Sequence, residues 1–194
     1  MNKILIATNN SHKLQEFKSI FKDLSVDLDI VSPSDFNDSS DPLEDGLTFE
    51  ENSYIKCKYY YDKYHLPTIA DDSGICIKYF NDYPGVHSSR FLKFDSYDTR
   101  NEYILELMKN VKDRSCVFHC CLCFIDENGD VKYYKSSICG EISKEAKGEF
   151  GFGYDPIFYL KDYNKTNAEL SNYGKNKISH RYKVVKDFVN ENCK

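Results

Sequence analysis

The sequence predicts an α/β protein with a mixed central sheet flanked by helices. Short apolar runs typical of buried strands alternate along the chain with segments whose apolar residues recur at helical spacing. Asn128-Gly129 separates two further apolar runs, and this dipeptide indicates an antiparallel hairpin. The chain has 194 residues and shows neither an internal repeat nor a low-complexity linker. We therefore expect a single domain over residues 1–194.

The first elements are a strand, a helix and a second strand. Residues 3–7 are apolar and short enough for a buried strand, and residues 26–31 fit the second strand. Ser11 begins the helix between them. Its apolar positions recur at helical spacing: Leu14, Phe17, Ile20, Phe21 and Leu24. A strand, a turn and a helix at this point present backbone N–H groups to an anion.

A second helix is expected over "TFEENSYIKCKYYYDKY", after a polar loop with proline and glycine. Thr48 and Glu51 form the pattern of a capping box, which fixes where this helix begins. Asn52 and Lys56 are four residues apart on it. They therefore lie on one polar stripe of the helix.

The stretch "TIADDSGICI" interrupts two apolar runs with two aspartates and a glycine. Aspartate is unfavourable in strands and costly to bury without a partner. We expect strands at 66–70 and 75–79, with the acidic quartet between them. From the residues alone the quartet fits an ordinary turn, or a metal or phosphate site at a strand end.

The rest of the chain alternates in the same way. The expected elements are an amphipathic helix at 99–111, the hairpin of 116–126 and 131–139, an aromatic loop "KGEFGFGYDPIFYL" that runs into a strand, and a final helix from about Ser179 that buries Val184, Val185, Phe188 and Val189.

Composition excludes several classes of partner. The net charge is -5 and the isoelectric point about 5.6, which argues against a surface made for nucleic acid. Mean hydropathy is -0.60 and no long apolar run occurs, so we expect no membrane-spanning helix. The apolar "ILIA" near the start is too short for the core of a signal peptide. The expected location is the cytoplasm.

Cysteine is frequent, with eight residues in the chain. The run "FHCCLCF" suggests zinc binding through His119, Cys121 and Cys123. Its alternation fits better with a strand that is buried on both faces, in which cysteine serves as a small apolar residue. We therefore expect structural, reduced thiols and no zinc.

Two further stretches suggest ligand contacts. "ATNNSHK" places Thr8, Asn9, Asn10 and Lys13 at a strand-to-helix turn, where an ammonium group and backbone N–H groups can hold phosphate, although a simple helix cap explains it as well. "EFGFGYDP" puts aromatic rings beside glycines, which suits a purine base or a tight turn. "KNKISHR" adds donors near a helix start, or only a solvated helix cap.

In this order the blocks "ATNNSHKLQEF", "EDGLTFEENSYIK", "IADDSG", "PGVHSSRF", "GEFGFGYDPIF", "KTNAEL" and "ISHR" closely resemble the inosine/xanthosine triphosphate pyrophosphatase family. The resemblance covers nearly the whole chain. It implies an elongated mixed α/β fold with a deep substrate cleft between two lobes, a homodimer and a need for Mg²⁺. The implied reaction converts ITP, dITP or XTP and water into the monophosphate and pyrophosphate, which clears such nucleotides from the pool.

The resemblance also assigns roles to residues. Asp72 is implied to be the catalytic carboxylate, which binds Mg²⁺ together with Glu44 and activates water. The triphosphate would be bound by Thr8, Asn9, Asn10, Lys13, Lys56 and Ser73, although the family often has glycine where this chain has Asn9. The base would be bound by Phe152, Gly153, Tyr154, Asp155, Lys175, His180 and Arg181.

Two alternatives remain. A related family of similar fold prefers dTTP, UTP or modified nucleotides, and the "FGYDP" and "SHR" blocks argue against it. The chain could also be a nucleotide-binding module without activity. The presence of Lys13, Lys56, Glu44 and Asp72 argues against this.

Overall fold

The computed structural model describes residues 2–93, 96–171 and 178–193. Its strands are β1 (Lys3–Ile6), β2 (Asp29–Val31), β3 (Thr68–Ile77), β4 (Tyr83–Pro84), β5 (Ser115–Ile125), β6 (Val131–Ile142), β7 (Phe158–Leu160) and β8 (Lys165–Thr166). Its α-helices are α1 (Ser11–Asp23), α2 (Phe49–Tyr64), α3 (Tyr97–Leu107) and α5 (His180–Asn192). Short 3₁₀ helices are η1 (Pro33–Phe36), η2 (Lys78–Phe80), η3 (Gly85–Lys93), η4 (Asp155–Ile157), η5 (Lys161–Tyr163) and η6 (Asn167–Glu169).

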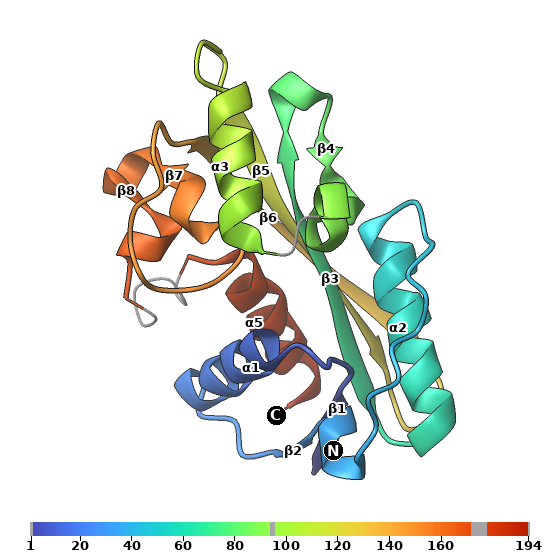
Figure 1. Cartoon of the computed structure of the whole chain (residues 1–194). Coiled ribbons are helices and arrows are strands. Elements are labelled where there is room, and N and C mark those ends of the chain that lie inside the picture. Colours follow the sequence, from blue (N-terminus) through green and yellow to red (C-terminus); the bar gives the residue numbers. More distant parts are fainter. Residues whose placement is uncertain (1, 94–95, 172–177, 194) are drawn as a thin grey trace. The chain divides into compact units, whose positions relative to one another are not determined.

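These strands form one mixed sheet of eight strands (Figure 1). The hydrogen-bonded order is β2-β1-β3-β5-β6-β7-β8, and β4 pairs with β3. The β1–β2 and β1–β3 pairs are parallel, whereas β3–β4, β6–β7 and β7–β8 are antiparallel. The predicted α/β class with a mixed sheet and flanking helices is confirmed.

The chain divides into two compact units. Unit 1 comprises residues 1–72, 120–136 and 181–194, and unit 2 comprises residues 73–119 and 137–180. Strands β3, β5 and β6 each contribute residues to both units. Each unit has a hydrophobic core of its own, as described next.

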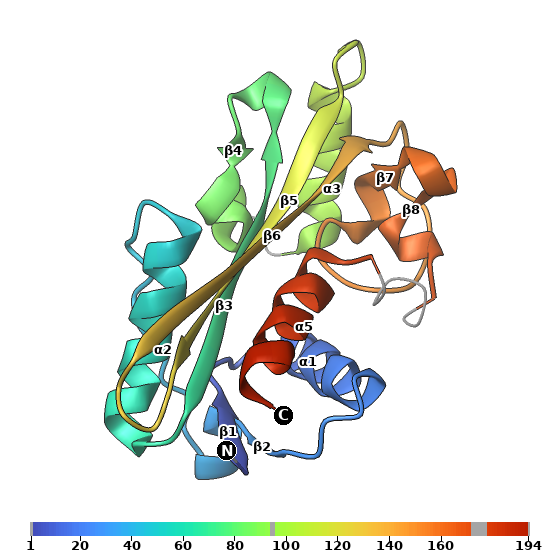
Figure 2. The same cartoon turned by 180° about the vertical axis from the view of Figure 1, so that it is seen from behind.

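Unit 1 buries both faces of its strands. Ile4 and Ile6 of β1 pack with α1 and α5 on one face, and Leu5 and Ala7 at the next positions pack with α2 on the other. Within β5, Cys120 belongs to the first core and Cys123 to the second. This alternation follows from the two-residue period of a strand. Figures 1 and 2 show α2 on one side of these strands and α1 and α5 on the other.

Unit 2 is built around aromatic and aliphatic side chains. Its core contains Ile104 and Met108 of α3, packed with residues of β3, β5 and β7. Phe118 of β5 lies against Phe158 of β7 with ring centroids 4.4 Å apart. The predicted cysteine-rich strand buried on both faces is confirmed as β5, and all eight cysteines are free thiols.

One sequence-based expectation is wrong. β3 runs without a break through Asp71, Asp72 and Gly74, so the acidic residues lie inside a strand and not in a turn between two strands. Gly74 does not adopt a left-handed conformation. The reason is that the buried carboxylate of Asp71 has cationic partners, described below, which remove the cost that normally keeps aspartate out of a buried strand.

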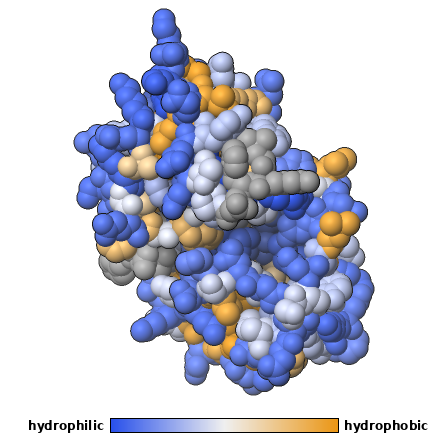
Figure 3. Space-filling model, viewed as in Figure 1, coloured by the Kyte–Doolittle hydropathy of each residue, from blue (hydrophilic) through white to orange (hydrophobic). Residues whose placement is uncertain are grey.

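The helices match their predictions within a few residues. α1 begins at Ser11, and the Thr48–Glu51 capping box starts α2. No helix in the described ranges is long and apolar enough to cross a membrane. The face seen in Figure 3 is largely hydrophilic, with apolar side chains in separate patches.

Candidate active site

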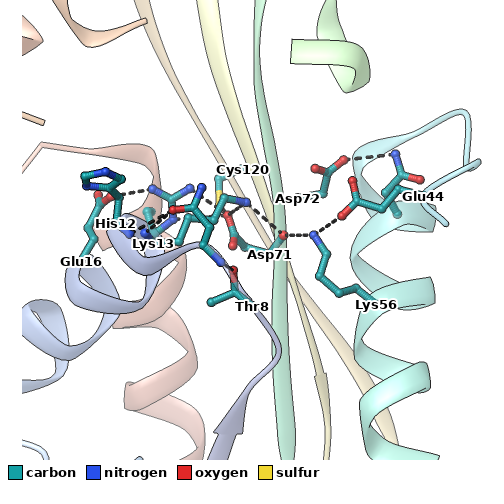
Figure 4. Close-up of polar contacts among 12 residues, drawn as sticks. Thr8, His12, Lys13, Glu16, Glu44, Lys56, Asp71, Asp72 and Cys120 are labelled. Atoms are coloured by element: carbon teal, nitrogen blue, oxygen red, sulfur yellow. Dashed lines mark hydrogen bonds and ion pairs between the residues drawn. The ribbon is translucent and has the colours of Figure 1, made fainter. Parts of the chain in front are cut away.

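Neighbouring aspartates of β3 point toward different partners within unit 1 (Figure 4). Asp71 faces Lys13 of α1 and Arg181 of α5. The Asp72 Oδ2 accepts a hydrogen bond of 3.2 Å from Asn52 Nδ2 of α2. Successive side chains of a strand point to opposite faces, so a continuous strand separates the two carboxylates. Both are buried, with 2% and 6% of their surface exposed.

Asp71 is surrounded by three cations. Its Oδ2 lies 2.8 Å from Arg181 Nη2 and 3.2 Å from Lys13 Nζ. Its backbone carbonyl oxygen accepts a hydrogen bond of 3.1 Å from Lys56 Nζ, and Lys13 Nζ lies 3.5 Å from the same oxygen. Burial raises the pKa of the Asp71 carboxyl, but the charges of Arg181, Lys13 and Lys56 outweigh burial and hold it well below its usual range.

Asp72 has the opposite shift. Burial raises its pKa, and the nearby negative charges of Glu44 and Asp71 add to this, while Lys56 and Lys13 oppose it. A carboxylate with a raised pKa accepts a proton more readily than an ordinary one. Of the two aspartates, Asp72 therefore has the electrostatic character of a base.

Lys56 connects the loop before α2 to the sheet. Its ammonium forms an ion pair with Glu44 and a hydrogen bond to the Asp71 carbonyl. Burial lowers the pKa of Lys56, but the negative charges of Glu44, Asp71 and Asp72 raise it by more. The net pKa is therefore above the usual value, and the side chain stays protonated. The predicted stripe of Asn52 and Lys56 on α2 is thus the face that meets Asp72 and Asp71.

Within the Thr8–Lys13 turn, Lys13 extends to Asp71. Asn10 caps α1, because its Oδ1 accepts hydrogen bonds from the backbone N–H groups of His12 and Lys13. Thr8 Oγ1 accepts a hydrogen bond from Asn10 N. The Asn9 amide is directed elsewhere, to residues 40 and 60. Ser73 follows Asp72 in β3 and is half-buried.

Arg181 pairs with acidic side chains of unit 1. Its guanidinium is buried and pairs with Asp71 and, at 2.7 Å, with Glu16 of α1. This is the arrangement of a buried structural ion pair. His180, which unit 2 contains, stacks on Phe118 with centroids 5.0 Å apart.

The aromatic loop of unit 2 is held by hydrogen bonds of its own. Asp155 accepts them from Phe152 N and from Asn167 Nδ2, at 2.9 and 3.2 Å. Gly153 has a φ of 70°, and Asn101 Nδ2 donates to its carbonyl at 3.0 Å. Tyr154 is a core residue that donates to the Ser88 carbonyl at 2.7 Å.

Unit 1 therefore brings together Lys13, Glu44, Lys56, Asp71 and Asp72. Unit 2 contains Phe152, Gly153, Tyr154, Asp155 and His180. Lys175 lies outside the described residues.

Sequence reasoning missed the roles of several polar residues. Asp71 contacts both lysines, and Glu16 is the second partner of Arg181. Asp41 lies within the electrostatic influence of this cluster: its pKa is raised by desolvation and by the charge of Glu44, while the charges of Lys56 and Lys13 lower it. The acidic loop before Thr48 carried a signal for Asp41, whereas the pairing of Glu16 with Arg181 joins residues 165 positions apart and left none.

Known proteins are similar to this chain over nearly its whole length. The sequence model of the Ham1 family matches residues 4–191. The chain belongs to the Ham1 family. This Ham1-family chain is 36% identical to a dITP/XTP pyrophosphatase of Aquifex aeolicus over 204 residues, which covers 98% of both proteins. A dITP/XTP pyrophosphatase of Treponema denticola is 40% identical, with 94% of each chain covered.

Solved Ham1 structures have the same fold as this Ham1-family chain. A HAM1 protein from Coxiella burnetii superimposes with a TM-score of 0.87 at 36% identity and covers 98% of both chains. The Ham1 protein of Staphylococcus aureus gives a TM-score of 0.84 at 35% identity, with 96% of each chain covered. The resemblance described from the sequence blocks is confirmed at the level of the family.

Proposed function

We propose that the chain, acting as one domain over residues 1–194, hydrolyses the α–β phosphoanhydride bond of deaminated purine nucleoside triphosphates. ITP, dITP and XTP are the proposed substrates, and the products are the monophosphate and pyrophosphate. The observation that carries the proposal is the cluster of unit 1, in which Lys13 and Lys56 flank Asp71 beside Glu44 and Asp72. Relatives named dITP/XTP pyrophosphatases, matched over nearly their full length, support the choice of substrate.

The two lysines are proposed to bind the phosphates. A triphosphate brings about four negative charges to a chain whose net charge is -5, so local cations must compensate them. Lys13 and Lys56 are held in place by the side chain and the backbone of Asp71. Positioning of this kind limits the reorganisation needed when phosphate oxygens replace the carboxylate as partners.

Magnesium is the proposed cofactor, with Glu44 and Asp72 as the residues that would hold it. Outside the gaps at 94–95 and 172–177, no three His, Cys, Asp or Glu side chains form a metal-binding group. Two carboxylates nevertheless fit Mg²⁺, which in nucleotide enzymes takes most other ligands from phosphate and water. Burial and the negative charge of Glu44 both raise the pKa of Asp72, so a cation bound by these two residues would relieve their repulsion. When bound, the ion would neutralise phosphate charge and polarise the phosphorus centre.

Asp72 is proposed to orient the attacking water and accept its proton. Its raised pKa suits this role, and the Asn52 amide fixes the position of the carboxylate. Water then attacks the α-phosphorus, and the P–O bond to the β-phosphate breaks, so pyrophosphate leaves with that oxygen. Binding of the purine base is assigned to the Phe152–Asp155 loop, Lys175 and His180, as the resemblance implies. The resemblance also names Arg181, but its guanidinium pairs with Asp71 and Glu16, so its proposed role is to hold that ion-pair cluster. The protein is further proposed to be a homodimer and to act in the cytoplasm.

Pyrophosphate release from dITP, XTP, ITP, ATP and dTTP tests the proposal, each with Mg²⁺ and with excess EDTA. We expect pyrophosphate from the deaminated purines, much slower release from ATP and none in EDTA. Preference for dTTP would favour the related family with other substrates. Nucleotide binding without any release would identify a binding module.

A further inference from the structure

The acidic loop before α2 lies along that helix as a regular series of contacts. As the residue number in the loop increases from Asp38 to Gly46, the residue number of the partner on α2 decreases from Tyr64 to Asn52. The contacts are Tyr64 Oη with Asp38 Oδ2 at 2.6 Å, Tyr60 Oη with the Ser40 carbonyl, Lys56 Nζ with Glu44, and Gly46 N with Asn52 Oδ1 at 2.8 Å. Figure 1 shows the loop running antiparallel to α2.

The four helix residues follow one another at intervals of four positions, so they lie along one stripe of α2. Glu44 is therefore one contact in a series, and its place depends on the contacts on each side. Ser40 is the contact nearest to it on the N-terminal side. Ser40 is held further by Tyr59, whose hydroxyl donates to Ser40 Oγ at 2.9 Å, and by its own hydrogen bonds to Asp38.

Asn9 joins the phosphate turn to this series. Its Nδ2 donates to the Ser40 carbonyl at 2.8 Å and to Tyr60 Oη at 3.2 Å. Tyr60 donates to the same carbonyl, so three groups meet at one point. The Tyr60 ring is fully buried, and burial raises the pKa of its hydroxyl to about 12, so it remains a donor at neutral pH.

We propose that Asn9 is a positioning residue that links the Thr8–Lys13 turn to the 38–46 segment and thereby sets the place of Glu44. This inference rests on the proposed function, in which the turn binds phosphate and Glu44 holds Mg²⁺. The resemblance implies a phosphate contact for Asn9, but its side-chain amide donates to the Ser40 carbonyl and Tyr60 Oη, so the proposed action of Asn9 is on the metal site through these two residues. The link couples the two parts of the site that must be aligned for hydrolysis.

Asn9→Ala and Tyr60→Phe test the link, since each removes one donor to the Ser40 carbonyl. In dITP hydrolysis we expect the MgCl₂ concentration for half-maximal rate to rise about three- to tenfold, the value of one hydrogen bond. The KM for dITP at saturating MgCl₂ should change by less than about twofold. The double variant should change less than the product of the single effects, because both donors act at one carbonyl.

A second readout does not depend on activity. Hydrogen exchange of the metal-free protein should be faster in the 38–46 segment of Asn9→Ala than in the original protein. Tyr134→Phe is the matched control: it removes a tyrosine hydroxyl of unit 1 that bonds to Glu191 and Asn192, and it should leave both readouts unchanged.

Unchanged exchange and an unchanged MgCl₂ requirement in Asn9→Ala would overturn the inference. A rise in KM for dITP with no change in the MgCl₂ requirement would also overturn it, because Asn9 would then contact phosphate directly. If the original protein hydrolyses none of the nucleotides, the proposed function fails, while faster exchange in 38–46 would still establish the link between Asn9 and the loop.

Discussion

The carboxylates of Asp71 and Asp72 show how far environment can separate two adjacent identical residues. Three cations hold the pKa of Asp71 down against burial, and burial raises the pKa of Asp72. Groups whose pKa values are pushed apart in this way take different tasks: one stays ionised as a fixed charge, and the other can exchange a proton. From the sequence, the resemblance favoured Asp72, but no pattern in "DD" predicted the separation.

Asp72→Asn should lower kcat for dITP by about a thousandfold, because the amide keeps the shape and cannot accept the proton. The melting temperature should stay within a few degrees of the original, since the amide can still meet Asn52. Steady-state kinetics at saturating MgCl₂ and a melting curve measure both. A kcat near that of the original protein would exclude Asp72 as the base.

Arg181→Ala should destabilise the protein by about 3–5 kcal/mol, because Asp71 and Glu16 would keep buried charges without their partner. We expect dITP and ATP hydrolysis to slow by the same factor, since the lysines at Asp71 lose their fixed position. Urea unfolding and kinetics with both nucleotides measure these effects.

Arg181→Lys is the matched variant. Lysine keeps the positive charge but lacks the planar guanidinium. The stability and hydrolysis rates of Arg181→Lys should therefore lie between those of the original protein and those of Arg181→Ala. Full stability combined with a loss confined to dITP would instead support the base contact that the resemblance implies.

Helix α2 shows which features of a fold a sequence predicts well. Its capping box fixes the start, and the register then places Asn52 and Lys56 on the stripe that faces the carboxylates. α1 and α5 were predictable for the same reason, since a helix has a local period and local caps.

Strand β3 and the shortest elements were not predictable. The break expected at Asp71 followed from strand propensity, which the contacts of Lys13 and Arg181 override. Strands β4 and β8 have two residues each, so they exist only through pairing with distant segments. A local pattern cannot contain that information.

Gly148, at the start of the aromatic loop, lets the backbone of this loop approach the backbone of Ala168 closely. A Cβ on Gly148, whose φ is 88°, would lie 2.1 Å from the carbonyl carbon of Ala168. Gly129 has a similar φ of 86°, but a Cβ there would meet only the Tyr61 hydroxyl, at 3.5 Å. Gly148→Ala should therefore lower the free energy of unfolding more than Gly129→Ala. The left-handed conformation alone costs about 1–2 kcal/mol. Urea unfolding of both variants gives the comparison, and equal losses would contradict the close approach.

The chain as a whole carries a net charge of -5, yet unit 1 concentrates cations around one buried carboxylate. This distribution, like the identity of the family, was accessible from the sequence only through the ordered blocks that carry the resemblance. Net charge alone points away from a polyanionic substrate. The local arrangement reverses that conclusion, because it places the ammonium groups of Lys13 and Lys56 together at Asp71.

The pH dependence of stability should report Asp71. Its folded pKa is lower than the unfolded value of about 4, so its ion pairs stabilise the fold above pH 4 and lose that contribution as the pH falls. The difference in unfolding free energy between the original protein and Asp71→Asn should be constant from about pH 5 to 8. Below about pH 4 it should shrink by about 1.4 kcal/mol per pH unit. A difference that stays constant down to pH 3 would contradict the depressed pKa.

The distribution of the cysteines gives the molecule an internal set of probes. Burial raises the pKa of Cys57 and Cys120 in unit 1 and of Cys116 in unit 2, so a thiol reagent meets them only after the surrounding structure opens. Cys139 is exposed and should react first. Because the buried thiols belong to separate cores, the order in which they are alkylated distinguishes the opening of unit 1 from that of unit 2 without any introduced label.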